Sequence, residues 1–212
     1  IAVIMGISID STSIMYILPI ALLMLLISPR YVCFAYAGGI VAISNLLFGF
    51  PKIHVPSIIA LVGLLHLIES MLIMADGSTG SIPVFIEHDE YGVVGAFMMR
   101  KFWPIPIILL TITASVQTGD VVSMPDWWPL IKPSIDSSAS QPIFVMIPVI
   151  AALGYSDMAV IDLPKRCSRF SGMLLLLYSV CLLTLSVIAQ DSTALQYLAA
   201  VASMLLFFMY EG

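Results

Sequence analysis

The chain has 212 residues, of which 60% are hydrophobic and only 10% are charged, and its mean hydropathy is +1.08. A soluble domain has about 45–50% apolar and about 25% charged residues, so the composition excludes an ordinary soluble fold and indicates a membrane protein. A net charge of −5 without a basic stripe gives no basis for nucleic-acid binding. In lipid, backbone N–H and C=O groups must form hydrogen bonds within the protein, which leaves helices or a closed barrel. The long, nearly unbroken apolar runs predict helices rather than a barrel.

The first third of the chain predicts a partial helix and three complete membrane spans. Residues 1–9 read as the outgoing end of a helix, and spans follow at 12–27, 31–50 and 56–74, separated by polar, proline and glycine breaks. The pair Gly38-Gly39 lies within the second complete span, where small residues allow close approach of a neighbouring helix.

A β-hairpin is predicted within the insertion 78–102, because residues 81–87 and 93–102 alternate roughly between apolar and other side chains. A short span is expected at 103–117. The polar, proline-rich stretch 118–141 reads as an extracytoplasmic loop. Its Trp127-Trp128 pair suits a membrane interface.

The last third predicts spans at 142–160, 172–189 and 194–210, with a basic loop before the second of them. The expected fold is therefore an all-α polytopic helical bundle of about seven to eight transmembrane segments with one short cytoplasmic β-hairpin. The chain begins and ends beside apolar runs, so residues 1–212 are expected to form a single transmembrane domain truncated at both ends.

The distribution of positive charge predicts the orientation. Six of the eight Lys and Arg residues fall in alternate loops that contain the hairpin and the basic loop, and only Lys52 and Lys132 fall in the others. The positive-inside rule then places the hairpin and the C-terminus in the cytoplasm of a multi-pass plasma-membrane protein. Candidate contacts with anionic lipids or an acidic partner are Arg100, Lys101, Lys165, Arg166 and Arg169.

His66 and Glu69 lie three residues apart within an apolar helix and share one of its faces. One interpretation is a proton relay or half of a metal site. The other, which we favour, is a neutral histidine hydrogen-bonded to Glu69 or to a polar group such as Asn45, which ties helices together. Asp157 offers the same choice between an ion or substrate site at a broken helix and a helix-end residue that pairs with a nearby base.

No pattern of a metalloprotease or of a nucleophile elbow is present, and the three cysteines lack metal-ligand spacing. We therefore expect no catalytic residues, no cofactor and no metal.

Several segments together resemble the membrane part of the PDZ-domain membrane proteins of Gram-positive bacteria, the MinJ-like division-site determinants. The resemblance covers about 53–169 and is carried by the segments 65–69, 83–86, 94–97, 100–106, 154–160 and 163–165. It implies a multi-span bundle that precedes a cytoplasmic PDZ domain and links a division-site scaffold to the Min inhibitor system. It carries over no catalytic residue.

The leading functional hypothesis is a non-enzymatic membrane scaffold or anchor for a cytoplasmic interaction domain, in bacterial division-site selection. Its expected partners are other membrane or division proteins, anionic lipids and further copies of the chain. The alternative is a proton-coupled transporter or channel that uses His66, Glu69 and Asp157. A third hypothesis, a metal-dependent intramembrane enzyme, would need a further carboxylate ligand that the sequence does not identify.

Overall fold

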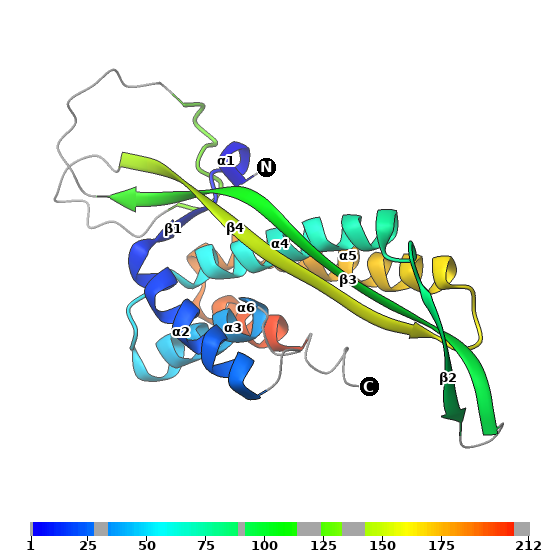
Figure 1. Ribbon diagram of the computed structural model, residues 1–212. Coiled ribbons are helices and arrows are strands. Elements are labelled where there is room, and N and C mark those ends of the chain that lie inside the picture. Colours follow the sequence, from blue (N-terminus) through cyan, green and yellow to red (C-terminus); the bar gives the residue numbers. More distant parts are fainter. Residues whose placement is uncertain (1, 28–33, 89–91, 114–123, 133–142, 206–212) are drawn as a thin grey trace. The chain divides into compact units, whose positions relative to one another are not determined.

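The computed structural model describes residues 2–27, 34–88, 92–113, 124–132 and 143–205 (Figure 1). Its elements in chain order are α1 (Ala2–Met5), β1 (Ser8–Asp10), α2 (Ser11–Ile27), α3 (Phe34–Phe48), α4 (Val55–Asp76), β2 (Ile82–His88), β3 (Gly92–Thr113), β4 (Ile143–Ala159), α5 (Pro164–Ile188), the 3₁₀ turn η2 (Ala189–Asp191) and α6 (Thr193–Met204).

The fold is α/β, so the predicted all-α bundle is wrong. The described residues form six α-helices and a four-stranded mixed sheet. In that sheet β1 is parallel to β3, β2 is antiparallel to it, and β4 also pairs with it. Figure 1 shows β4 running beside β3 in the opposite direction.

The error lies in the predicted spans 103–117 and 142–160. Residues 103–113 instead form the second half of β3, and residues 143–159 form β4. Pro104 and Pro106 remove two backbone donors and oppose a helix. They are two residues apart, so both missing N–H groups fall on one edge of the strand. In β4, Pro148 follows a run rich in Ile, Val and Phe, residue types that favour strands.

The chain divides into two compact units. Unit 1 comprises 1–64, 108–149 and 181–212, and unit 2 comprises 65–107 and 150–180. The long elements α4, α5, β3 and β4 therefore contribute residues to both.

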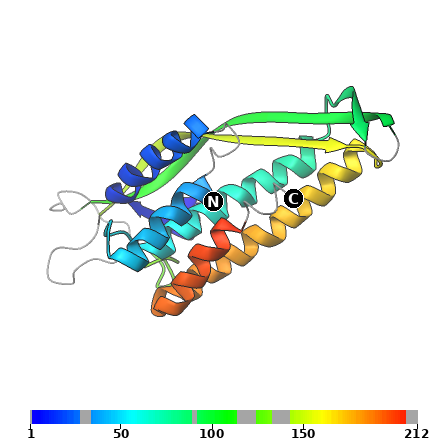
Figure 2. The ribbon, with the colours of Figure 1, turned by 90° about the horizontal axis from the view of Figure 1, so that it is seen from below.

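In unit 1, α3 packs against α2 and α6, as Figure 2 also shows. Close packing depends on glycine, as the sequence predicted: a Cβ on Gly38 would lie 2.9 Å from an Ile58 methyl, and one on Gly39 would lie 2.7 Å from Ser203 Oγ. Gly63 of α4 likewise faces Leu183 of α5, whose backbone nitrogen would lie 3.2 Å from an added Cβ. Small residues thus let three pairs of helices approach closely.

In unit 2, the predicted hairpin is present, with β2 and β3 paired from Ile82↔Met98 to His88↔Gly92. α4 and α5 approach each other at Gly172, where an added Cβ would lie 3.1 Å from the Ser70 carbonyl oxygen. Side chains on β4 alternate between buried and exposed from Ala151 to Ala159, so one face of this strand is covered.

Two helices of the described chain are long and apolar enough to cross a membrane: Val55–Asp76 and Pro164–Asp191. The apolar helices at 12–24, 34–48 and 193–204 are shorter than the roughly 20 residues that a span requires. The prediction of seven complete spans is therefore wrong for the residues described. Of the predicted loop 118–141 only 124–132 is described, and residues 206–210 of the last predicted span lie outside the described residues.

Candidate functional site

His66 and Glu69 lie together in unit 2, as their spacing predicts. Only 3% of the His66 side chain and 12% of the Glu69 side chain are exposed, and Nε2 of the histidine lies 4.0 Å from Oε2 of the glutamate. The ring of Tyr178, on α5, packs edge-on against the imidazole with 6.0 Å between ring centroids. The pair thus sits where α4 meets α5, and it joins these helices within unit 2.

Asn45 makes its side-chain contact within unit 1. Its Nδ2 donates to the carbonyl oxygen of Pro51 at 2.5 Å, and the neighbouring Ser44 hydroxyl donates to the Phe50 carbonyl at 2.8 Å. Both side chains satisfy carbonyls in the turn that follows α3, where orphan backbone groups need partners. Its amide therefore stabilises this turn instead of pairing with a histidine.

Asp157 is the centre of the densest polar cluster in the described chain. Its Oδ2 accepts hydrogen bonds from the Tyr155 hydroxyl at 2.9 Å, the Ser171 hydroxyl at 2.8 Å and the Cys167 thiol at 3.5 Å. Its Oδ1 accepts from the backbone N–H of Met158 at 2.7 Å. Burial and the adjacent carboxylate raise the pKa of the Tyr155 hydroxyl, which keeps that group protonated as a donor.

The local sequence explains how this cluster forms. Tyr155 and Asp157 are two residues apart on β4 and share a face of the strand. Cys167 and Ser171 are four residues apart and share a face of α5. The Asp157 carboxylate therefore links the end of β4 to the first turns of α5 through hydrogen bonds. The prediction of a helix-end residue paired with a base is therefore wrong: Asp157 lies on strand β4, its donors are hydroxyl, thiol and backbone N–H groups, and Arg166 pairs with Asp162 at 3.3 Å.

A second cluster, which the sequence did not indicate, joins α4 to β3 in unit 2. Lys101 Nζ lies 3.0 Å from Asp76 Oδ2, and Trp103 Nε1 donates to the same oxygen at 3.2 Å. A carboxylate at the C-terminal end of a helix is disfavoured by the helix dipole, and the lysine offsets this. The sequence feature that could have indicated this cluster is the two-residue spacing of Lys101 and Trp103, which places both side chains on one face of a strand.

The basic residues near the start of α5 lie on its surface. Lys165, Arg166 and Arg169 are exposed, and Arg100 is exposed on β3, whereas Lys101 is largely covered and paired. Further along α5 an apolar stripe is exposed, consisting of Phe170 (60%), Met173 (51%), Leu177 (64%) and Val180 (47%). Basic and apolar surfaces thus follow each other along one helix.

Within the ranges that the structure describes, no group of three or more His, Cys, Asp or Glu side chains could hold a metal ion. His66 and Asp157 instead contact side chains of neighbouring elements within unit 2, and Asn45 contacts the turn that follows its own helix. No protein-family model, no curated protein and no solved structure matches this chain.

Proposed function

We propose that this chain is a membrane-embedded, non-enzymatic scaffold. The observation that carries the proposal is the exposed apolar stripe of α5, Phe170, Met173, Leu177 and Val180, which begins beside the basic residues Lys165, Arg166 and Arg169. In water such a stripe would leave several large side chains unprotected. In a bilayer it faces lipid tails while the basic side chains meet anionic headgroups.

The candidate polar residues support a structural role. His66 packs on Tyr178, Asp157 accepts hydrogen bonds from both β4 and α5, and Asp76 joins α4 to β3. Each group connects two secondary-structure elements within unit 2. This is the use expected of polar side chains in a scaffold, where interhelical polar contacts stabilise packing.

The orientation we propose follows from the two candidate spans. Three basic residues lie at the N-terminal end of α5, and its other end, around Asp191, has none. The positive-inside rule then places the start of α5, the end of α4 and the hairpin 78–102 in the cytoplasm. Because α6 has only 12 residues and is shorter than a span, residues 193–204 lie in this orientation on the side of the membrane opposite the hairpin, whereas the sequence predicted a cytoplasmic C-terminus.

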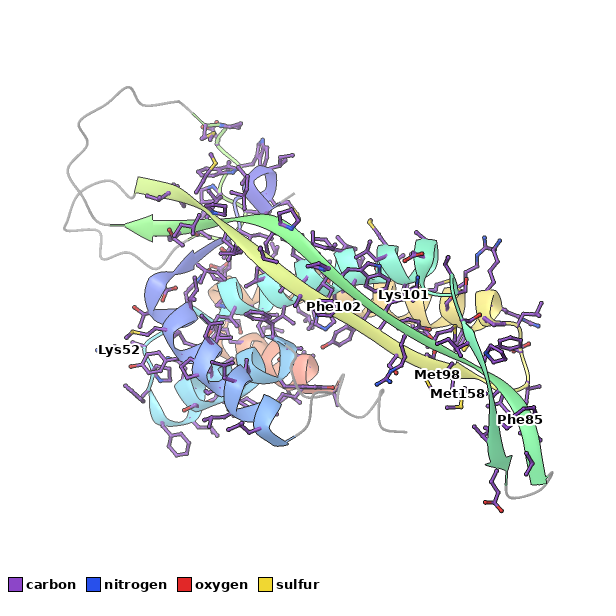
Figure 3. All side chains as sticks on the ribbon, viewed as in Figure 1. Lys52, Phe85, Met98, Lys101, Phe102 and Met158 are labelled. Carbon is purple, nitrogen blue, oxygen red and sulfur yellow. The ribbon has the colours of Figure 1, made fainter. Side chains whose placement is uncertain are left out.

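The proposed partners are other membrane or division proteins, as in the PDZ-domain membrane proteins that the sequence resembles, together with anionic lipids. A photo-crosslinking amino acid at Phe85 or Phe102, both exposed on the strands of unit 2 (Figure 3), tests this. Discrete protein adducts in native membranes support a scaffold. Adducts to lipid alone at both positions contradict it.

The second candidate is a proton-coupled transporter or channel. It is favoured by one observation, the presence of a buried His66–Glu69 pair inside a span-length helix, because intramembrane ionisable residues are frequently functional. This function predicts a proton flux in proteoliposomes that Glu69→Gln abolishes while the fold is retained. A scaffold predicts no flux above that of protein-free vesicles.

A further inference from the structure

Three segments of unit 1 that are distant in sequence converge near the end of α5. Residues 2–7 are joined to residues 124–132 by two hydrogen bonds: Leu130 N–H donates to the Met5 carbonyl at 3.1 Å, and Trp128 Nε1 donates to the Val3 carbonyl at 3.0 Å. Gly6, with φ +65°, permits this approach, because a Cβ there would lie 2.6 Å from Pro129 Cα.

Gln190, in the 3₁₀ turn η2 that follows α5, binds the same loop with both ends of its amide. Nε2 donates to the Leu130 carbonyl at 3.1 Å, and Oε1 accepts from the Lys132 backbone N–H at 2.8 Å. Nε2 also donates to the Val187 carbonyl at 3.0 Å. The amide is therefore fully engaged, and it holds Leu130 to Lys132 in a fixed position beside the helix.

A pocket of about 300 Å³ lies between these segments. The two hydroxyl groups in its lining are both engaged in their own helix, since Thr184 donates to the Cys181 carbonyl at 2.8 Å and Ser186 to the Leu183 carbonyl at 2.7 Å. The pocket thus offers a ligand only apolar contacts. Its lining is Met5, Ile7, Ala60, Leu130, Ile131, Leu183, Thr184, Ser186, Val187 and Ile188.

A positive charge adjoins this apolar pocket. Lys132 directly follows the lining residue Ile131, is exposed, and forms no ion pair with any carboxylate in the described ranges. Its backbone is held by Gln190, so substitution of the side chain leaves that hydrogen bond intact. An apolar pocket beside an exposed ammonium group matches a long apolar chain that carries an anionic head.

We propose that this pocket binds one acyl chain of an anionic phospholipid, with the phosphate near Lys132. The inference rests on the proposed membrane location, but it concerns a specific lipid site in place of general contact with the bilayer. Anionic lipid is favoured over neutral lipid because Lys132, the charged residue next to the pocket lining in the loop 124–132, is cationic.

The test uses the full chain in proteoliposomes that contain phosphatidylglycerol with a photoreactive group on one acyl chain. Labelling is mapped by mass spectrometry. Adducts on 130–131 and 183–188 are expected to exceed those on the exposed stripe 170–180. Replacing phosphatidylglycerol with phosphatidylcholine should reduce labelling of the pocket by about tenfold, a factor equivalent to about 1.4 kcal/mol.

Two substitutions and their controls separate pocket binding from general lipid contact. Thr184→Trp fills the pocket from an exposed position on α5 and should abolish labelling there, whereas Cys181→Trp, exposed and outside the lining, should not. Lys132→Gln should reduce labelling by phosphatidylglycerol, and Lys132→Arg should retain it. Thermal unfolding of each variant identifies any loss of fold, and Thr184→Asp is the second pocket variant if the tryptophan variant unfolds.

Three results would overturn this site. They are equal labelling along the whole exposed face of α5, pocket labelling that survives Thr184→Trp, and labelling by a photoreactive free fatty acid but not by the phospholipid. If the chain inserts in the bilayer and yet shows one of these patterns, the lipid site is wrong and the membrane location stands. If α5 does not lie in the bilayer, the proposed function itself fails.

Discussion

Substitution of Asp157 tests most specifically whether the polar clusters are structural. Asp157→Ala removes the acceptor of the Tyr155, Ser171 and Cys167 side chains. Hydrogen bonds to a charged group contribute about 1.5–3 kcal/mol, and a buried donor left unsatisfied costs about 1–3 kcal/mol. The Tyr155 side chain is buried and Asp157 is partly exposed, so we take the lower end of each range and expect a loss of about 2.5 kcal/mol in the free energy of unfolding.

The assay is unfolding of the purified chain in detergent micelles by titration with a denaturing surfactant, followed by circular dichroism. Tyr155→Phe should lose about 1 kcal/mol, and the double variant should lose less than the sum of the two, since the residues share a hydrogen bond. The matched control is Asp162→Ala, which removes an exposed pair with Arg166 at 3.3 Å. It should change stability by less than about 0.5 kcal/mol.

Equal effects of the Asp157 and Asp162 substitutions would refute this reasoning. So would an Asp157→Asn variant of unchanged stability that had lost a measurable ion flux. The first result would show that the cluster contributes nothing beyond an exposed ion pair. The second would assign Asp157 to transport.

Three further predictions follow from other residues. Gly172→Val should destabilise the chain by about 2 kcal/mol or more, because its side chain meets the Ser70 carbonyl and Met74, whereas Gly95→Ala, with nothing within 4 Å, should be nearly neutral in the same unfolding assay. Burial lowers the pKa of His54, and the nearby Asp10 carboxylate opposes this shift to a smaller extent. The free energy of unfolding should therefore be highest above about pH 6.5 and decrease at lower pH, where the unfolded chain takes up a proton that the folded chain does not. His54→Gln should make this decrease smaller in unfolding curves measured across the same pH range. Glu69→Gln should leave a vesicle proton-flux signal at the protein-free level, as for the unsubstituted chain.

Much of the helical part of the fold could be predicted from the sequence. The helices α2, α3 and α4 fall within or close to the predicted ranges, since proline, glycine and capping residues bracket apolar runs of helical length. The predicted span 172–189 is also helical, but α5 already begins at Pro164, so most of the predicted basic loop forms its first turns. The glycine pair of α3 and the hairpin were also predicted correctly. These features depend on residues that are near one another in sequence.

The strands after Phe102 could not be predicted in the same way. An apolar run without polar interruptions shows no hydrophobic periodicity, so the pattern cannot distinguish a buried strand from a helix. Once composition had indicated lipid, the segments 103–117 and 142–160 were interpreted as spans. The prolines at 104, 106 and 148 were the contrary signal.

The sequence predicted those parts of the candidate site in which both residues lie on one helix or strand, because their spacing alone shows that they share a face. His66 and Glu69 share a helix face by their three-residue separation, but Tyr178 comes from another helix and no local pattern indicates it. For Asp157 the sequence offered a helix-end residue beside a base as one interpretation, but the residue lies on strand β4 and accepts from hydroxyl and thiol groups on α5, which come close only through the fold.

The most direct test of the proposed membrane scaffold is the depth of α5 in a lipid bilayer. Nitroxide spin labels at Arg166, Phe170, Leu177 and Ile188, all exposed in the structure, report collision with oxygen in lipid and with a nickel chelate in water. We predict contact with the chelate at Arg166, a rise in oxygen contact at Phe170 and the highest oxygen contact at Leu177. Uniformly high contact with the chelate at all four positions would contradict a membrane location for this helix.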